Sequence, residues 1–295
     1  MAAKRILSII GATGQQGSSV LRAVLKDGTF TPRALTRTPD SEASLTLKAR
    51  GVDVVKADTS DASSLLEALR GSEGVFAATL SNSPDEVADG KRIVDASKAV
   101  GVKFFVFSSV PGITTLSGGK MTQVKMYDDK EAIENYLKAS GLGHGRLRPK
   151  PTGGYNISFP YPPNALHSWT WVHHDVGQAA LALFKSYLGQ AADRKAREEI
   201  SGKAYPVVTA NLTFPALVEI LSKGLGVEVT FTQVETTGMD HLDKMIAAQA
   251  AYDGFFADIP VPNPALVALG AEFGTVEEFV ETEVKKRFGP GTAKQ

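Results

Sequence analysis

The stretch RILSIIGATGQQG, residues 5–17, decides how this chain begins to fold. An apolar run at residues 6–10 leads into Gly11, Gly14 and Gly17, which follow one another at three-residue steps. The pattern predicts a buried strand, a tight turn and the start of a helix. The first glycine permits the turn, the second leaves room for a phosphate, and the third lets helix and strand pack closely. Because the N–H groups that open a helix attract anions, the stretch predicts a dinucleotide site.

Strand and helix patterns then alternate through the first half of the chain. We predict further strands at residues 32–36, 52–55, 74–78 and 102–107, followed by a sixth, with a helix in each interval. This rhythm is typical of right-handed crossovers and of an α/β fold with a doubly wound parallel sheet. We therefore assign residues 1–150 to a dinucleotide-binding domain.

The second half changes character, because prolines and glycines crowd its first residues. We assign residues 151–295 to a smaller α/β domain that closes a cleft over the carboxyl ends of the parallel strands. Residues 205–209 are expected to return to the main sheet as an edge strand. We expect an extended segment at 169–172, followed by a helix at about 175–187. A helix capped by Thr213, a strand at 227–231 and a helix at 240–252 come next. A capping box at Thr275 opens the last helix, which ends at Phe288.

Composition narrows the class of protein. The 295 residues are 43% hydrophobic and 22% charged, and the formal net charge is zero. An ordinary globular chain with no excess of positive charge is a poor ligand for DNA or for an anionic membrane. The absence of cysteine excludes disulfides, zinc–thiolate sites and thiol nucleophiles. With no membrane-span or secretory-signal pattern, we expect a soluble protein of the cytoplasm or nucleus, without a metal centre.

The end of the second predicted strand bears on the choice of cofactor. An NAD site usually has an acidic residue there, but this chain has Thr-Arg-Thr at residues 36–38 and no carboxylate before Asp40. A guanidinium can pair with a 2′-phosphate, so Arg37 favours NADP; the alternative is a solvated arginine. Asp58 could accept a hydrogen bond from adenine or could be a turn residue. Thr79 ends the fourth strand, where small residues would let the cofactor approach the backbone or would serve core packing.

Several motifs together resemble the NmrA-like family of atypical short-chain dehydrogenase/reductases. They are GATGQQG at residues 11–17, LTRTP at 35–39, the later Lys130, and VHHDVG at 172–177. The resemblance covers roughly residues 4–235. It implies a Rossmann domain that binds NADP(H), in proteins that are either reductases or catalytically silent redox sensors with regulatory protein partners. The cofactor contacts expected from it and from the motifs are Gly11, Thr13, Gly14, Gln15, Gln16, Gly17, Arg37, Asp58, Thr79, Ser108 and Lys130.

A catalytic centre is harder to predict. Short-chain dehydrogenases use a Tyr-x-x-x-Lys pair, in which the lysine holds the ribose and lowers the pKa of the tyrosine that transfers the proton. Here Lys130 matches, but Met126 stands at the tyrosine position. Tyr127 is one residue away, which turns it by about 100° on a helix, so it cannot simply substitute. Lys130 is thus the one catalytic candidate, and a solvated helix lysine is the alternative.

Other polar residues near the expected cleft have less support. Ser108 and Ser109 end the fifth strand, where a hydroxyl could orient a substrate carbonyl or only satisfy the backbone. Tyr155 lies in the proline-rich loop that would line a pocket. On an extended strand the adjacent residues His173 and His174 would point to opposite faces, which argues against a shared metal ion. Trp169 and Trp171, two residues apart, would share one face as core or pocket wall.

Two functions therefore remain open. The first is an NADP(H)-binding, redox-responsive regulator that acts through protein partners, as the cofactor motifs beside Met126 suggest. The second is an NADPH-dependent reductase of a small carbonyl or unsaturated substrate, with Lys130 as its principal polar group. Direct DNA binding has neither a helix-turn-helix pattern nor a basic stripe to support it.

Overall fold

A seven-stranded parallel sheet forms the centre of the molecule. The computed structural model describes residues 5–81, 83, 85–148, 156–189, 192–252 and 255–288. The strand order is β3-β2-β1-β4-β5-β6-β9, so the chain winds outward from β1 in both directions, as predicted for a doubly wound sheet. Its strands are β1 (Ile6–Ile10), β2 (Thr31–Thr36), β3 (Asp53–Lys56), β4 (Ser72–Ala77), β5 (Phe104–Ser108), β6 (His144–Arg148) and β9 (Ala204–Pro206).

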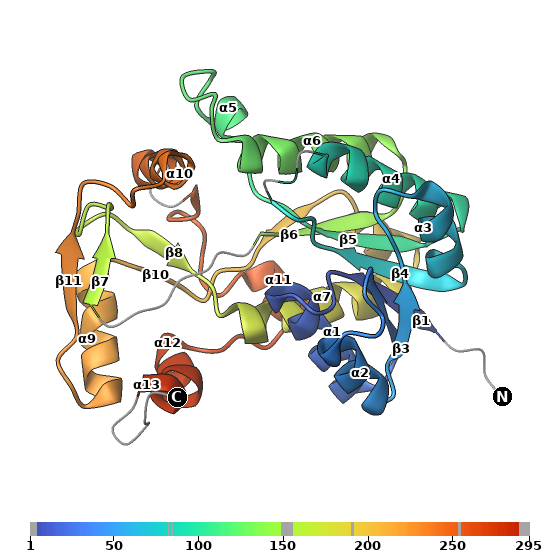
Figure 1. Cartoon of the computed structure of the whole chain (residues 1–295), viewed down its shortest axis with the longest axis horizontal. Helices are drawn as coiled ribbons and strands as arrows, with labels where there is room; N and C mark the ends of the chain where they lie inside the picture. The colour runs from blue at the N-terminus through green and yellow to red at the C-terminus, as the bar shows by residue number, and fades with distance from the viewer. Residues whose placement is uncertain are drawn as a thin grey trace.

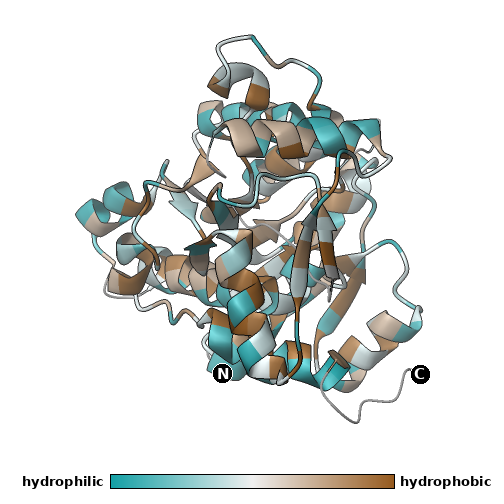
Figure 2. Ribbon diagram, turned by 90° about the vertical axis from the view of Figure 1, so that its left-hand side faces the viewer, coloured by the Kyte–Doolittle hydropathy of each residue, from teal (hydrophilic) through white to brown (hydrophobic). Residues whose placement is uncertain are grey.

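Helices cover both faces of this sheet (Figure 1). On one face the core is formed with α1 (Gln15–Asp27), α2 (Glu42–Ala49), α7 (Val172–Leu188), α8 (Arg194–Ile200) and α11 (Pro264–Ala268). On the other it is formed with α3 (Ala62–Leu69), α4 (Glu86–Ala99) and α6 (Lys125–Ala139), and the short α5 (Ile113–Leu116) precedes α6. Figure 2 shows apolar and polar residues side by side along the helices, the pattern of helices that bury one face.

Helices α1 and α7 lie unusually close together. A Cβ built on Gly177 would lie 2.4 Å from the carbonyl oxygen of Ser19, so only glycine fits at this crossing. The Gly177 N–H donates to Ser19 Oγ at 3.0 Å. The position of α1 on the sheet therefore fixes the position of α7, which leads from the second lobe of the molecule.

That second lobe contains two small sheets and the remaining helices (Figure 1). Strands β7 and β11 pair in parallel, and β8 and β10 pair antiparallel. Leu217, Leu221 and Val280 belong to one apolar cluster of the lobe, and Tyr161, Phe214 and Ile246 form another. Its elements are β7 (Asn156–Phe159), β8 (His167–Trp169), β10 (Ala210–Leu212), α9 (Phe214–Leu225), β11 (Thr230–Gln233), α10 (Asp240–Ala251), α12 (Val276–Phe279), the π-helical segment η2 (Val280–Val284) and α13 (Lys285–Phe288).

Several local predictions for the second half are confirmed. β9 is the predicted edge strand of the main sheet, beside β6, although it spans Ala204–Pro206 rather than 205–209. The Thr213 side chain caps α9, and Thr275 and Glu278 form the predicted capping box. The last helical segment reaches Phe288, which is the last described residue, and a π-helical turn interrupts it.

Several predicted elements differ from the observed ones in their bounds, and two of these differences have a physical reason. The expected extended segment at 169–172 ends earlier, because β8 stops at Trp169 and α7 begins at Val172. His173 and His174 therefore lie in the first turn of a helix, and the prediction that they sit on an extended strand was wrong. The strand expected at 227–231 begins only at Thr230, because Ser222 Oγ accepts from the Val229 N–H at 2.9 Å and holds the preceding residues in a turn.

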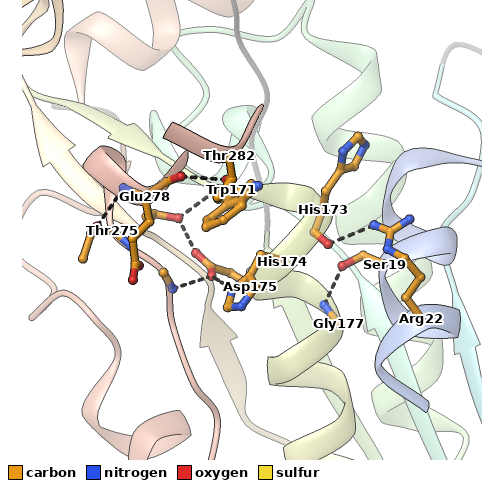
Figure 3. Close-up of polar contacts among 12 residues, drawn as sticks. Ser19, Arg22, Trp171, His173, His174, Asp175, Gly177, Thr275, Glu278 and Thr282 are labelled. Atoms are coloured by element: carbon orange, nitrogen blue, oxygen red, sulfur yellow. Dashed lines mark hydrogen bonds and ion pairs between the residues drawn. The ribbon is translucent and has the colours of Figure 1, made fainter. Parts of the chain in front are cut away.

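Asp175 joins three segments at the junction of the two lobes (Figure 3). Its carboxylate is fully buried and accepts hydrogen bonds from Thr209 Oγ1 and, at 3.0 Å, from the Gly274 N–H. His174 Nδ1 lies 2.8 Å from Asp175 Oδ1. The carboxylate thus ties α7 to the segment before β10 and to the segment before α12.

The hydrogen bond to Asp175 raises the pKa of His174; burial opposes the shift, and the charges of Asp175, Glu278 and Glu272 add to it. Because the pKa is higher in the folded state, protonated His174 stabilises the fold fully below its unfolded pKa of about 6.5. This stabilisation is lost as the pH rises through the raised folded pKa. We therefore expect the free energy of unfolding of wild type, minus that of His174→Gln, to fall between pH 5.5 and pH 8.5 in urea titrations.

The matched control is Arg194→Gln, because the Arg194 guanidinium is exposed and stays charged over this range. The free energy of unfolding of wild type, minus that of Arg194→Gln, should be independent of pH. If the free energies of unfolding of wild type and His174→Gln changed with pH in parallel, the His174–Asp175 pair would not stabilise the fold in the way that we expect.

Candidate functional site

A cleft of about 800 Å³ opens at the carboxyl ends of β1, β2 and β4. Among the segments that line it are the glycine-rich turn after β1, the end of β2 with Arg37, and the segment after β4 with Thr79. The volume lies within the usual range for small-molecule sites. Of the residues predicted to contact a cofactor, the cleft brings together Gly11, Thr13, Gly14, Gln15, Gln16, Gly17, Arg37 and Thr79.

The glycine-rich turn has the backbone geometry that the sequence predicts. Gly11 adopts φ +75°, and the Gly14 N–H donates to the Gly11 carbonyl at 2.9 Å. A Cβ on Gly17 would lie 2.1 Å from the Gly11 carbonyl oxygen, so a side chain there is incompatible with this packing. The N-cap residue of α1 is Gly14, which has no side chain to accept from the first helical N–H groups. These groups are therefore suited to binding an anion such as a pyrophosphate.

Gln16 supplies a further test of whether a ligand fits. Its Oε1 atom is buried and has no hydrogen-bond partner among the described residues. A buried acceptor without a donor is costly, and a ligand hydroxyl or amide in the cleft would satisfy it. The residues present thus fit a dinucleotide, which carries both kinds of donor.

Asp58 lies beside this cleft and is engaged in a turn. Its Oδ1 accepts from the N–H of Ser60 at 2.9 Å and from the Ser60 hydroxyl at 2.7 Å. These hydrogen bonds lower the pKa of Asp58, and the positive charge of Arg37 contributes less. The neighbouring Thr59 lines the cleft, whereas Asp58 does not. The geometry favours the turn role, and adenine recognition by Asp58 stays a prediction.

Lys130 is held below the cleft rather than in solvent. Its Nζ lies 2.6 Å from Glu86 Oε1 and 3.0 Å from Thr79 Oγ1. The Lys130 side chain is 12% exposed and that of Glu86 is fully buried, which contradicts the alternative of a solvated helix lysine. Thr79 and Glu86 line the cleft and place the lysine next to it. Sequence patterns did not reveal Glu86, because it lies 44 residues from Lys130.

The position of the usual catalytic tyrosine is apolar in this protein. Met126 packs in a cluster with Ile113 and Val124. Tyr127 is buried and its hydroxyl accepts from Gln249 Nε2 at 2.7 Å. Burial raises the pKa of Tyr127 to about 12. Tyr127 is therefore a structural link between α6 and α10, in agreement with the expectation that it cannot replace the missing tyrosine.

The two serines at the end of β5, Ser108 and Ser109, are buried. Ser109 Oγ donates to Glu134 Oε2 at 2.8 Å, so its hydroxyl has a structural role. Ser108 is 4% exposed and is not among the residues that line the cleft. Its contact with a cofactor stays a prediction.

A second cavity, of about 530 Å³, lies between α9, β7, the start of α7 and the C-terminal helices. Trp169 and Trp171 both line it, which agrees with the second of the two roles expected for them, core or pocket wall. His173 also lines it, whereas His174 pairs with Asp175; Figure 3 shows the two rings pointing in different directions. Tyr155 lies outside the described residues.

The part of the chain that the structure describes contains neither a membrane-spanning helix nor a cluster of metal-binding side chains. None of its helices combines the length and the apolar character needed to cross a bilayer. None of its His, Asp and Glu side chains gather in threes or more around a point that could hold a metal ion.

Curated proteins with similar sequences are named as oxidoreductases. The NmrA-like family domain-containing oxidoreductase FrzB of Cladobotryum sp is 40% identical over 144 residues, which are 46% of this chain and 43% of that protein. A second, from Aspergillus versicolor, is 27% identical over 263 residues, 75% of this chain and 70% of the relative. The match to the first relative thus spans less than half of its length.

Solved structures share the fold over nearly the whole chain. NmrA, a negative transcriptional regulator solved in complex with NADP, has a TM-score of 0.78 and 20% identity, with 97% of each chain covered. An NADPH-dependent quinone oxidoreductase from Escherichia coli, solved with NADPH, has a TM-score of 0.70 and 21% identity, covering 93% of this chain and 98% of the other. The model of the NmrA-like family matches residues 3–289, well beyond the expected limit near residue 235. The chain belongs to the NmrA-like family.

Proposed function

We propose that this protein binds NADP(H) in the cleft above β1, β2 and β4 and acts as a redox-responsive regulator through protein partners. One observation carries the proposal: the dinucleotide features are intact, but Met126 replaces the proton-transferring tyrosine and Tyr127 is buried against α10. The regulator NmrA, which shares this fold, was solved with NADP. A protein with a bound nicotinamide and no proton donor is suited to sensing its redox state.

Each part of the cofactor has a corresponding group in the cleft. The N–H groups that open α1 would hold the pyrophosphate, and Arg37 would pair with the 2′-phosphate. Lys130, held by Thr79 and Glu86, would reach the nicotinamide ribose. When bound, NADPH supplies a hydride, and NADP accepts one.

The first test concerns Arg37. Replacement by alanine removes the guanidinium that would pair with the 2′-phosphate, a charge-assisted contact worth about 1.5–3 kcal/mol. We expect Arg37→Ala to weaken NADP(H) binding about 10- to 150-fold while NAD(H) binding changes less than about threefold. Isothermal titration calorimetry with both cofactors measures the difference.

Arg194→Ala is the matched control, because it removes the same charge from an exposed position on α8. It should leave both affinities unchanged. If Arg37→Ala lowered the affinities for NADP(H) and NAD(H) equally, Arg37 would not be the residue that pairs with the 2′-phosphate.

The regulatory function also predicts what the protein does not do. We expect tight NADPH binding without steady loss of nicotinamide absorbance across a broad panel of aldehydes, ketones and enones, because Met126 stands at the position of the tyrosine and Tyr127 is buried against α10. Absorbance at the nicotinamide band, followed with each compound in turn, checks this. Turnover of any of them at an ordinary enzymatic rate would make the regulatory account incomplete.

The second candidate function is an NADPH-dependent reductase. It is favoured by the buried position of Lys130 beside the cleft and by the naming of curated relatives as oxidoreductases. In this function Lys130 polarises the substrate carbonyl or holds the ribose, and no tyrosine is required. Turnover that Lys130→Met abolishes, with the fold intact, would favour this function over the first.

The fold must be checked, because Lys130 and Glu86 form a buried pair. Lys130→Met leaves an uncompensated carboxylate, and we expect it to lower the free energy of unfolding by about 3–5 kcal/mol. The double variant Lys130→Met/Glu86→Gln removes both charges and should recover most of this loss. Urea unfolding of the two variants and of wild type measures the recovery. A double variant that is no more stable than Lys130→Met would contradict a direct interaction between the two side chains.

A further inference from the structure

The second cavity has the walls of a small-molecule site. Its volume of about 530 Å³ falls within the range of known ligand pockets. Its lining includes four aromatic residues and a leucine: Trp169, Trp171, Phe214, Phe279 and Leu217. We call this space the indole cavity. Gln15 and Val172 line both this cavity and the dinucleotide cleft, so the two are neighbours.

Two residues that line the indole cavity each carry a buried hydrogen-bond donor without an acceptor among the described residues. The Nε1 atoms of Trp169 and Trp171 are buried, and neither has a partner within the described part of the chain. Thr170 Oγ1 donates to the Val207 carbonyl at 2.6 Å and Thr209 Oγ1 donates to Asp175, and neither hydroxyl accepts from an indole N–H. Buried polar groups in folded proteins nearly always have partners, so these two N–H groups need an explanation.

The two rings are fixed by their surroundings. The backbone N–H of Trp171 donates to Thr209 Oγ1 at 2.7 Å, and its ring stacks on His174 with centroids 4.8 Å apart. Gly274 makes room for this ring, since a Cβ there would lie 2.5 Å from it. The Trp169 ring contacts Phe214 edge to face at 5.6 Å. The donors are therefore preorganised rather than loosely placed.

We propose that the indole cavity binds a planar aromatic compound with a carbonyl oxygen that accepts hydrogen bonds from the two indole N–H groups. Aromatic walls favour a flat ring system, because stacked and edge-to-face contacts add to the burial of apolar area. An oxygen acceptor satisfies the donors that a hydrocarbon would leave unpaired. This inference goes beyond the proposed function, because it requires neither turnover nor a protein partner.

The indole N–H signals of the two tryptophans report directly on ligand binding in this cavity. The chain has two tryptophans, and both line the indole cavity. The full chain, without nucleotide, would be titrated with chromone, which is bicyclic, planar and carries a carbonyl, and with naphthalene, which has the same shape and no oxygen. In ¹H–¹⁵N correlation spectra chromone should shift both indole N–H signals downfield. Calorimetry should show naphthalene binding about tenfold more weakly.

Trp169→Phe and Trp171→Phe keep an aromatic ring and remove one N–H each. Each should weaken chromone binding about 3- to 10-fold, the value of one hydrogen bond, and change naphthalene binding less than twofold. Thermal unfolding checks that both variants fold; if either does not, the shifts of the wild-type indole signals decide.

Indole signals that chromone leaves in place, or equal affinity of chromone for wild type and folded phenylalanine variants, would overturn the proposal. Because nucleotide is absent from these titrations, their outcome is independent of whether the protein binds NADP(H).

Discussion

The contact between Gly17 and the Gly11 carbonyl is the constraint from which the other arrangements follow. No side chain fits there, since a Cβ on Gly17 would lie 2.1 Å from the oxygen, so α1 packs directly on the turn after β1. This sets the start of α1 at the cleft. Through the similarly close crossing of Ser19 and Gly177 it also sets α7, whose first turn carries Asp175 to the junction between the lobes.

Local patterns predict the local features of this protein well. The glycine turn, the Thr213 cap of α9 and the capping box at Thr275 all depend on neighbouring residues, and all are present. The pairs Glu86–Lys130 and β7–β11 join residues far apart in the chain, and no local pattern encodes them. His173 and His174 were misplaced for a related reason, because hydrogen bonds from Thr209 and Gly274 to Asp175 fix the start of α7.

The pairing of Lys130 with Glu86 changes what the missing tyrosine means. In a Tyr-x-x-x-Lys pair, the positive lysine stabilises the tyrosinate. Here a fully buried carboxylate lies 2.6 Å from the Lys130 ammonium, and the hydroxyl of Thr79 completes its contacts. The charge of Lys130 is thus compensated without any tyrosine. The second carboxylate oxygen of Glu86 is buried without a partner among the described residues, and proton transfer would need a group that Met126 does not supply.

The shared wall of the two cavities links the two proposals physically. Gln15 opens α1 and Val172 opens α7, and both residues face the dinucleotide cleft and the indole cavity. A ligand that moved either side chain in one cavity would change the shape of the other, and the two binding free energies would then be coupled. Coupling of this kind is reciprocal: if NADPH alters the affinity of the indole cavity for an aromatic carbonyl compound, that compound alters the affinity for NADPH by the same factor. A redox-responsive regulator built on this fold would therefore respond to the aromatic ligand as well as to the nicotinamide.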